Sequence, residues 1–363
     1  MLVFVRNNEN SFLGVIICLS PLIILGVLSL AKNILFINAG LMEPNFAIIF
    51  QCYTYNLTIQ PLILFCLGGL YILLFLFAHR VKLFLSLALF CLLSAFALWS
   101  LKYYVTAVEP KKCLIKYEII TTNKITKPIK IVHFSDIQSA RIGDYEAYVF
   151  EKIANLSPDL ILYTGDFLQL DASLDFDDQW NELKLLFKDL KPRLGIYAVF
   201  GDTEFELYSK TEQELEPITM LSSKSDTFEY EGGKISLLGL SLYQSKRPLW
   251  AMRSIEKWED NEPDERLFRI LMGHAPDFAL ALKDSNIDLC LAGHTHGGQV
   301  RLPLIGPLII DSKVPTNWAH GCHQIGIPFL NVSAGVGSNR FNGLPPIRFN
   351  CPTEFTLIEL VPE

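Results

Sequence analysis

Three long apolar stretches in the first third of the chain constrain its fold more than any other feature. They cover residues 12–37, 57–78 and 83–101. A helix needs about 20 such residues to cross the hydrocarbon core of a bilayer, and each stretch has about that length. The sequence therefore predicts that residues 1–108 form an all-α transmembrane region with three helices.

Two other interpretations of this region are open at the level of sequence. The first stretch would be a signal peptide if it were cleaved, but its apolar run is long for one and no small-residue cleavage site ends it. The whole region would otherwise be a very apolar, soluble helical domain. Trp99, Tyr103 and Tyr104 favour the transmembrane interpretation, because aromatic side chains of this kind gather at membrane interfaces.

The basic residues around the stretches favour a cytoplasmic location for the rest of the chain. Only residues 79–82 separate the second stretch from the third, which predicts a tight antiparallel hairpin. Three basic residues lie on the side of this turn, Arg6, Arg80 and Lys82. Five lie on the other side, Lys32, Lys102, Lys111, Lys112 and Lys116.

The remaining residues, 109–363, carry nearly all of the acidic side chains and are enough to bury a core of their own. The net charge of −7 argues against nonspecific binding to nucleic acid, which requires a basic face. The eight cysteines form no CxxC pair, so the chain has neither a disulfide framework nor a zinc knuckle. Free thiols favour a reducing compartment.

A strand–loop–helix pattern repeats through this second part. Apolar runs predict strands at 129–134, 159–163, 195–200, 268–272 and 287–292, and helices are predicted at 145–156 and 178–190. Each strand is followed by side chains of metal-binding type, which are Asp136, Gln138, Asp166, Asp202, His274, His294 and His296. One such acid is more often a turn former or a helix cap, but turn chemistry does not explain five strand ends in succession.

These strand ends predict one metal site, because α/β sheets hold their ligands where the carboxyl ends of the strands converge. The loop Gly293–Gln299 presents two imidazoles that are separated by one residue and flanked by glycines. On such a backbone each ring is able to reach a different ion. Carboxylates mixed with imidazoles suit Mn²⁺, iron or Zn²⁺ rather than calcium.

The order of the motifs resembles the calcineurin-like metallophosphoesterases, whose usual pattern is DxH, GD, GNH(D/E), H and GHxH. The corresponding segments here are Asp136-x-Gln138, Gly165-Asp166, Gly201-Asp202-Thr203-Glu204, His274 and Gly293-His294-x-His296. The resemblance covers most of residues 129–360. Segments 333–337 and 346–350, together with the GHTHGGQ loop, resemble the membrane-anchored bacterial branch of the family.

The resemblance implies a four-layer α/β/β/α sandwich over residues 109–363 with a two-metal centre, manganese being expected and iron or zinc the alternatives. By matching positions, the first metal would be held by Asp136, Gln138, Asp166 and His296. The second would be held by Asp166, Asp202, His274 and His294, so that Asp166 is the bridging ligand. Such a pair lowers the pKa of a bound water and neutralises charge on phosphoryl oxygens.

Three positions depart from the family pattern. Gln138 stands where the family has His, which replaces an imidazole by an amide oxygen, a poorer ligand. Asp202 replaces the usual Asn and adds a negative charge to the second metal site. Thr203 replaces the catalytic His; its hydroxyl donates a hydrogen bond but is no general acid near pH 7.

Within that branch, the multi-span N-terminus is similar to the enzymes of lipid A synthesis that hydrolyse UDP-2,3-diacylglucosamine. The resemblance implies a multi-pass protein of the bacterial inner membrane that releases UMP and an acylated sugar 1-phosphate. UMP is a stable anion that leaves with little acid catalysis, which makes Thr203 tolerable. The alternatives are a phosphoesterase for another lipid or envelope phosphate, or a decayed domain kept as a membrane scaffold.

Several further side chains are candidates for the site or for the substrate. Arg348 is the preferred arginine to grip phosphate, with Arg141 and Arg340 next, although an arginine at such a position is more often an ordinary surface or structural one. The apolar segment 302–330 is expected to form an acyl-binding or membrane-facing lip, or else a buried strand pair. His133 is expected in the core. His320 and His323 are expected in a solvated loop, and the alternative is a metal site.

Overall fold

A computed structural model describes residues 8–42, 46–77, 81–282, 285–340 and 344–363. Within it the chain forms two compact units, Met1–Thr106 and Ala107–Glu363.

The first unit is helical. Its elements are α1 (Asn8–Met42), α2 (Ala47–Cys52), the π-helix η1 (Tyr53–Ile59), α3 (Gln60–Phe77) and α4 (Lys82–Tyr103). Leu64 and Tyr71 of α3 pack against Leu87, Cys91 and Ala95 of α4, and the two helices lie side by side. His79 and Arg80, in the predicted turn, lie outside the described residues.

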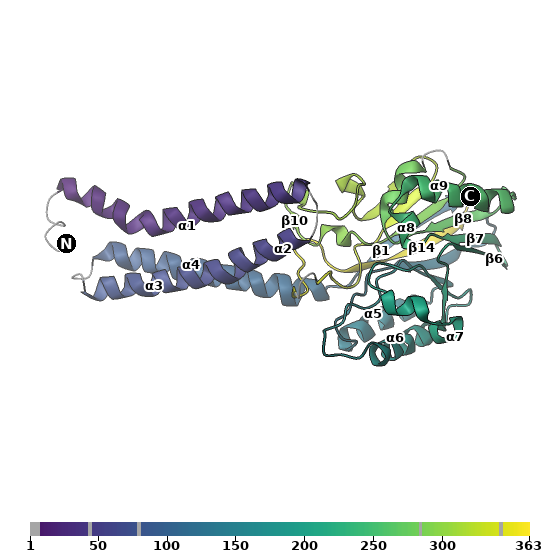
Figure 1. Ribbon diagram of the computed structural model, residues 1–363, viewed down its shortest axis with the longest axis horizontal. Helices are drawn as coiled ribbons and strands as arrows, with labels where there is room; N and C mark the ends of the chain where they lie inside the picture. Colours follow the sequence, from purple (N-terminus) through teal and green to yellow (C-terminus); the bar gives the residue numbers. More distant parts are fainter. Residues whose placement is uncertain (1–7, 43–45, 78–80, 283–284, 341–343) are drawn as a thin grey trace. The chain divides into compact units, whose positions relative to one another are not determined.

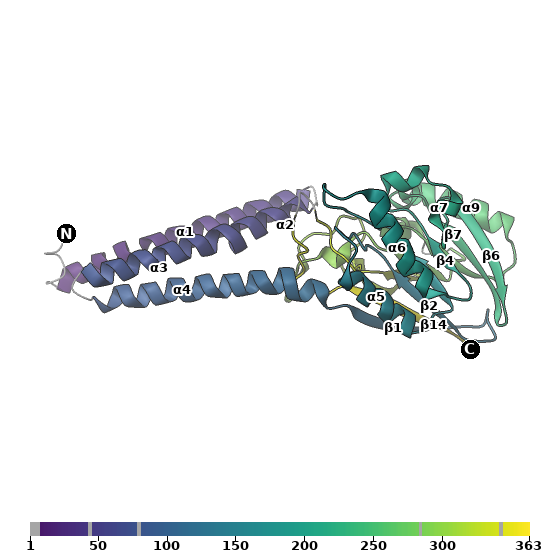
Figure 2. The ribbon, with the colours of Figure 1, turned by 90° about the horizontal axis from the view of Figure 1, so that it is seen from below.

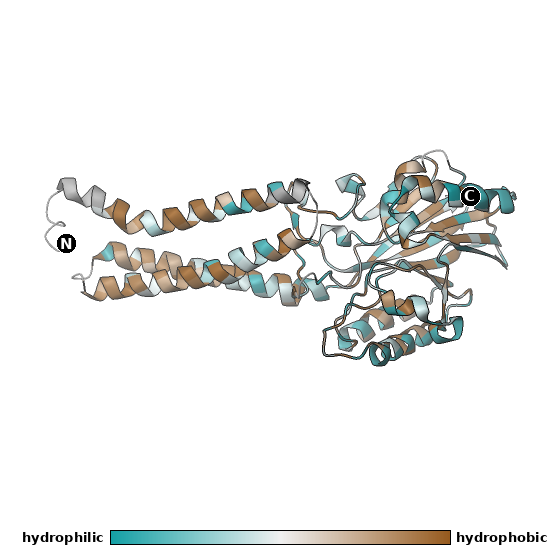
Figure 3. Ribbon diagram, viewed as in Figure 1, coloured by the Kyte–Doolittle hydropathy of each residue, from teal (hydrophilic) through white to brown (hydrophobic). Residues whose placement is uncertain are grey.

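Three helical segments are long and apolar enough to cross a membrane, Gly14–Phe36, Ala47–Phe77 and Lys82–Lys111. Most of their residues are hydrophobic (Figure 3), and many large apolar side chains of these segments are exposed, among them Leu28, Leu76 and Phe96. The second segment begins before residue 57 because polar side chains there are satisfied by a neighbouring helix. Asn56 Nδ2 donates to Asn33 Oδ1 at 2.9 Å, and Ser29 Oγ donates to Asn56 Oδ1 at 3.1 Å.

The second unit contains two six-stranded sheets. The first has the strand order β1-β14-β2-β3-β4-β5, and the second has the order β12-β13-β9-β8-β7-β6. The strands of the first sheet are β1 (Leu114–Thr122), β2 (Ile129–Phe134), β3 (Leu160–Tyr163), β4 (Ile196–Ala198), β5 (Ile218–Met220) and β14 (Glu354–Pro362). Those of the second are β6 (Lys224–Tyr230), β7 (Gly233–Gly239), β8 (Phe268–Met272), β9 (Leu289–Ala292), β12 (Gly321–Gln324) and β13 (Phe329–Val332).

Helices and short helical turns precede or connect these strands. They are η2 (Tyr104–Val108), η3 (Glu109–Lys111), α5 (Asp144–Asn155), α6 (Phe176–Leu190), η4 (Phe205–Ser209), α7 (Glu212–Leu215), α8 (Leu242–Ser245), α9 (Pro248–Asn261), η5 (Pro276–Ala281), η6 (His296–Gly298) and η7 (Thr316–Trp318). A small hairpin joins β10 (Arg301–Leu302) to β11 (Gly306–Pro307).

Three apolar layers hold the second unit together. One packs α5 and α6 on the first sheet, a second fills the space between the two sheets, and a third packs α9 on the second sheet. The layer order is therefore α/β/β/α, from α5 and α6 on one side to α9 on the other (Figure 1). The mixed α/β character predicted for residues 109–363 is confirmed.

The sheet register brings the predicted strand ends to one edge. Strands β2, β3 and β4 run parallel to one another in the first sheet, and β8 and β9 run parallel in the second. Because the two sheets face each other, the predicted ligand side chains approach one another from the strand ends of both sheets. The predicted apolar segment 302–330 divides: β10 and β11 form an exposed hairpin, while Ile309 and Ile310 are buried.

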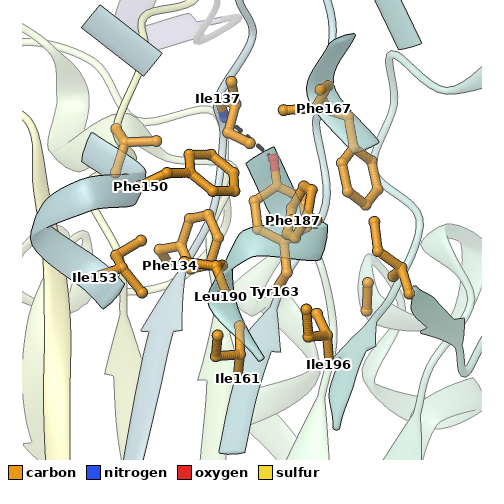
Figure 4. Packing of buried hydrophobic residues seen from close by; sticks show 14 of the residues in the cluster. Phe134, Ile137, Phe150, Ile153, Ile161, Tyr163, Phe167, Phe187, Leu190 and Ile196 are labelled. Carbon is orange, nitrogen blue, oxygen red and sulfur yellow. Dashed lines mark hydrogen bonds between the residues drawn. The ribbon is translucent and has the colours of Figure 1, made fainter. Parts of the chain in front are cut away.

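An aromatic cluster packs beneath the loops that follow β2 and β3. Phe134, Phe150, Tyr163 and Phe187 pack with ring centroids 4.8–6.0 Å apart, as Figure 4 shows. The Tyr163 hydroxyl accepts a hydrogen bond from the backbone N–H of Ile137 at 3.2 Å. It donates one to the carbonyl of Asp166 at 2.8 Å. One buried phenol therefore joins the loops that follow β2 and β3.

Candidate metal centre

The predicted ligands meet at the carboxyl ends of five strands. Asp136 and Gln138 follow β2, Asp166 follows β3, Asp202 follows β4, His274 follows β8, and His294 and His296 follow β9. Their potential ligand atoms form two groups of three, and within each group all three atoms lie within 4.8 Å of one another. The groups are Asp202, His274 and His294, and Asp136, Asp166 and His296.

The two histidines of the GHTHGGQ loop fall into different groups, the division that the sequence predicts. His294 Nδ1 lies 3.4 Å from Asp202 Oδ2, and His296 Nε2 lies 3.5 Å from Asp136 Oδ1. Ligation of metal by these atoms stays a prediction. His320 and His323 belong to no such group among the described residues.

Asp166 lies between the groups. Its Oδ1 atom lies 3.4 Å from His274 Nε2 and accepts from the backbone N–H of Asp202 at 2.7 Å. Its Oδ2 atom accepts from the side-chain amide of Gln138. Oδ1 therefore faces the group of Asp202, His274 and His294, while Oδ2 faces Gln138, so the carboxylate of Asp166 is positioned to act as a bridging ligand.

The backbone around these side chains is strained. Asp136, Gln138, Asp166, His294 and His296 all have positive φ angles, from 35° to 68°. Non-glycine residues seldom adopt this region, and such conformations persist only where surrounding structure imposes them. Their concentration at one site indicates that the side chains are held in place for a function.

Two glycines allow the loops to approach so closely. A Cβ atom on Gly201 would collide with the Asp166 carboxylate, and one on Gly293 would collide with the carboxylate of Asp136. Gly201 and Gly293 are therefore needed so that the ligand side chains can pack closely, and not only so that the chain can turn.

The carboxylates lack sufficient positive charge around them. Burial raises the pKa of Asp136 to about 6, although His274 opposes this effect. Burial likewise raises the pKa of Asp166 well above its usual value, again against His274. Burial alone would lower the pKa of His274, but Asp166 and Asp136 outweigh it and raise that pKa to about 9. The proton on His274 provides positive charge beside these carboxylates, and a bound metal ion would provide that charge in its place.

His274 is oriented as a ligand, and Gln138 has a buried oxygen atom that is not hydrogen-bonded among the described residues. The Nδ1 atom of His274 lies 2.7 Å from the carbonyl of Thr164, so a proton there leaves Nε2 to face the carboxylates. Gln138 is 2% exposed, and its Oε1 atom has no hydrogen-bond partner among the described residues. An unpaired buried amide oxygen costs free energy, and a cation would satisfy it.

Thr203 lies beside the bridging position. Its backbone N–H and hydroxyl approach Asp166 Oδ1 at 3.2 and 3.4 Å. Both groups donate, so Thr203 orients Asp166. Its neighbour Glu204, which no sequence motif marks as a ligand, accepts from the backbone N–H groups of Phe167 and Gly201 at 2.7 and 2.6 Å. The Glu204 carboxylate therefore ties the loop after β3 to the loop after β4.

The three arginines proposed for phosphate binding have other surroundings than the prediction requires. Arg348 is 0% exposed, and its guanidinium donates to backbone carbonyls, among them those of Ala334 at 2.7 Å and Gly337 at 3.0 Å. These donors are already used, so the geometry does not support a role in gripping phosphate. Arg340 pairs with Asp171 at 3.3 Å, and Arg141 is exposed.

Arg348 instead lies behind the first group, with Nη2 3.5 Å from His296 Nδ1. The cation that contacts a candidate ligand from the more open side is Lys246, whose Nζ atom lies 3.3 Å from Asp202 Oδ2. Both side chains are about one-third exposed, at 37% and 35%. Sequence inspection missed Lys246, because no motif marks it. The extra charge of Asp202 was the available signal that a cation would be nearby.

His133 is buried as expected but takes part in a polar chain. Its Nδ1 atom accepts from Asn331 Nδ2 at 2.7 Å, and its Nε2 atom lies 3.0 Å from the Thr164 hydroxyl. Asn331 comes from β13 of the second sheet, so the contact links the two sheets next to the site.

Comparison with known proteins gives the family. A family model described as calcineurin-like phosphoesterase matches residues 129–298. The metallophosphoesterase YkuE of Bacillus subtilis, which is itself uncharacterised, is 30% identical over 243 residues, covering 64% of this chain and 78% of that protein. The chain belongs to the calcineurin-like phosphoesterases. The phosphodiesterase YaeI of Escherichia coli is 28% identical over 268 residues, covering 68% of this chain and 88% of that one.

As a calcineurin-like phosphoesterase, the chain is a metal-dependent hydrolase of phosphoesters. The residues fit divalent cations on three counts: two donor groups, carboxylates short of positive charge, and an orphaned amide oxygen. The family also implies divalent ions at this place, and their identity is a separate question.

Proposed function

We propose that this calcineurin-like phosphoesterase is membrane-bound and cleaves a phosphoanhydride or phosphodiester bond of an acylated substrate. The observation that carries the proposal is the pair of three-residue donor groups, because Asp166 belongs to one group and its Oδ1 atom lies 3.4 Å from His274 Nε2 of the other. Three apolar helical segments ahead of the catalytic unit support the membrane assignment.

The specific substrate that we propose is UDP-2,3-diacylglucosamine, with UMP and 2,3-diacylglucosamine 1-phosphate as products. Water adds its oxygen to one phosphorus, and the bridging oxygen leaves with the other phosphate. We place the catalytic unit in the cytoplasm, attached to the bacterial inner membrane, where this nucleotide-linked lipid would be accessible. Reporter fusions after residue 363 test that location, and an outer location would contradict it.

The donor groups define how the metals would be held. Asp136, Gln138, Asp166 and His296 would hold one ion, and Asp166, Asp202, His274 and His294 would hold the other. Two divalent ions would lower the pKa of a bound water molecule and would stabilise the negative charge on the phosphoryl oxygens. Manganese is our proposal for the metal, with iron and zinc as alternatives.

The chain's own residues position these parts. The Thr203 hydroxyl and backbone N–H hold Asp166 Oδ1, and the Thr164 carbonyl fixes the orientation of the His274 ring. The Thr203 hydroxyl is no general acid near pH 7, so the site suits a leaving group that departs as an anion. A nucleoside monophosphate meets this condition, and a simple alkoxide does not.

The deciding assay follows UMP release by the full-length protein in detergent, with Mn²⁺ and UDP-2,3-diacylglucosamine. We expect release that a chelator abolishes and that added Mn²⁺ restores. Absence of chelator-sensitive UMP release would refute this substrate. Hydrolysis of other membrane phosphodiesters would then favour the second candidate, a phosphoesterase for a different lipid phosphate. The similarity to the Escherichia coli phosphodiesterase YaeI supports this candidate.

Metal analysis separates either enzyme from a decayed scaffold. Up to two ions per chain are expected for an enzyme, whereas a scaffold could lack them. The strained ligand backbone and the grouping of six donors favour retention of the site.

A further inference from the structure

A short hairpin with an apolar tip follows the GHTHGGQ loop directly. It consists of β10 and β11, and its tip carries Leu304 and Ile305. Leu304 is fully exposed, and Ile305 is 73% exposed. Leu304 also has a φ angle of 67°, a conformation that favours glycine, although the residue there is a large apolar one. Exposed apolar side chains on a strained tip indicate a contact surface.

The base of this hairpin is tied to the segment that precedes β14. Val300 forms a β-bridge with Phe349, and the N–H of Arg301 donates to the Phe349 carbonyl at 2.9 Å. Arg301 Nη1 also donates to the carbonyl of Gly297 at 3.0 Å. The hairpin is therefore anchored both to the metal-binding loop and to residues 349–353.

The same segment, 349–353, holds the end of the last candidate membrane span. The N–H of Cys351 donates to Glu109 Oε1 at 2.8 Å, and the Thr353 hydroxyl contacts the carbonyl of Pro110 at 3.4 Å. The candidate span Lys82–Lys111 ends at these residues. Within the second unit, the apolar hairpin is thus joined through one segment to the place where the chain leaves the span.

We infer that Leu304 and Ile305 insert into the lipid bilayer and so hold the GHTHGGQ loop at the membrane surface. The substrate class that follows is a phosphate carried by a membrane lipid, not a phosphate dissolved in water. This inference rests on the proposed function and deepens it. The bilayer is the occupant because the hairpin shares its anchoring segment with the end of a membrane span, and because apolar tips of this kind bury favourably in lipid.

The chain offers a matched control. Ile327 is a 61% exposed isoleucine in the turn between β12 and β13, another antiparallel connection. That turn precedes β13, which is parallel to β9, so Ile327 lies at the end of the second sheet opposite to the metal-binding loop. A charge placed there alters an exposed apolar turn without touching the hairpin.

The first experiment compares two substrates. Full-length protein is reconstituted in vesicles of phosphatidylethanolamine and phosphatidylglycerol that contain UDP-2,3-diacylglucosamine, and soluble bis(p-nitrophenyl) phosphate is assayed in parallel. With Leu304→Asp and Ile305→Asp combined, we expect turnover of the lipid to fall at least about tenfold while most of the soluble activity persists. Ile327→Asp should leave both activities unchanged.

The second experiment identifies what the tip touches. A photoreactive benzophenone amino acid at position 304 should form adducts with lipid, and the same group at position 327 should not. Adducts with a second copy of the chain or with another protein, in place of lipid, would overturn the inference.

The two failures are distinguishable. If the wild-type protein cleaves the lipid and the double variant cleaves it equally well, the hairpin inference is wrong and the proposed function stands. If the wild-type protein cleaves neither substrate, the proposed function is wrong, and lipid adducts at position 304 still decide whether the tip is inserted.

Discussion

Replacing Arg348 by methionine tests how the first donor group is held in place. The Arg348 side chain is completely buried. It donates to the carbonyls of Ala334 at 2.7 Å, Gly337 at 3.0 Å and Cys351 at 3.1 Å, and Nη2 lies 3.5 Å from His296 Nδ1. One guanidinium therefore joins three loop carbonyls behind the ring of a candidate ligand.

The loop that Arg348 holds also supports Asp136. The N–H of Gly337 donates to the carbonyl of Asp136 at 2.7 Å, and a Cβ on Gly335 would lie 2.8 Å from the Cβ of Asp136. Displacement of this loop would move Asp136 as well as His296. Loss of such supporting contacts lowers metal affinity by about 10- to 100-fold in other metal sites.

The expected loss of stability follows from the same contacts. Three hydrogen bonds from a charged donor contribute about 1.5–3 kcal/mol each, or roughly 4–9 kcal/mol together. Removal of a buried charge that has no carboxylate partner among the described residues recovers part of this, because burial of that charge opposes folding. We therefore expect Arg348→Met to lower the free energy of unfolding by about 3–5 kcal/mol.

Arg269 provides the matched control. It is 1% exposed, and its Nη2 atom donates to the carbonyls of Glu262 at 2.6 Å and Asp264 at 3.0 Å. It lies in β8 near the end opposite to His274. Two such bonds contribute about 3–6 kcal/mol, and removal of the buried charge recovers part of this. Arg269→Met should therefore also destabilise the fold, by about 2–4 kcal/mol, but should leave metal affinity intact.

The assay combines urea unfolding with Mn²⁺ titration of the detergent-solubilised proteins. We expect both variants to unfold at lower urea and only Arg348→Met to bind Mn²⁺ more weakly. Equal metal affinity in the wild type and Arg348→Met, or equal loss in both variants, would refute the positioning role. If Arg348→Met does not fold, Arg348→Lys, which keeps the charge and loses the fork of donors, takes its place.

Three further changes test the site and the core. Asp166→Asn should raise the activation free energy of phosphoester hydrolysis by several kcal/mol and so slow the reaction about a thousandfold, because it removes the negative charge between the two donor groups. Retained activity with normal metal content would contradict the bridging assignment. Lys246→Met should lower kcat/KM about two- to fivefold, since a pair this exposed contributes about 0.5–1 kcal/mol, and the loss should shrink in an Asp202→Asn background; an undiminished loss there would exclude the pairing. Burial lowers the pKa of His133 from 6.5 to about 3, so the unfolded chain binds a proton that the native protein refuses, and stability should fall as the pH drops from about 6.5. His133→Gln should reduce the slope of unfolding free energy by up to about 1.4 kcal/mol per pH unit between those values, and urea unfolding at pH 4.5–7 that shows an unchanged slope would contradict a buried neutral His133.

The strands and most of the donor set were predictable because local pattern determines them. Apolar runs such as 129–134 and 268–272 are buried strands, and the polar residue after each run necessarily lies at a strand end. The division of His294 and His296 between two groups was also predictable, because alternate residues on a glycine-flanked loop point apart.

Contacts between distant segments were not predictable in the same way. Strand β14 lies between β1 and β2, which no local periodicity of residues 354–362 indicates. Arg348 was expected to grip phosphate because its type suits that task, yet the fold places it among loop carbonyls. Lys246 reaches Asp202 only because α8 lies next to the site.

The departures from the family pattern become consistent when their charges are considered together. The usual pattern places two carboxylates and one neutral Asn among the donors, whereas this chain has three carboxylates, at Asp136, Asp166 and Asp202. Gln138 in place of His changes no charge when the imidazole is neutral. Lys246, 3.3 Å from Asp202, offsets the added negative charge. The total charge presented to two divalent ions is therefore close to that of the usual pattern. A decayed site has no need of such an offset, so the pairing of Asp202 with Lys246 is an argument for retained metal-dependent hydrolysis.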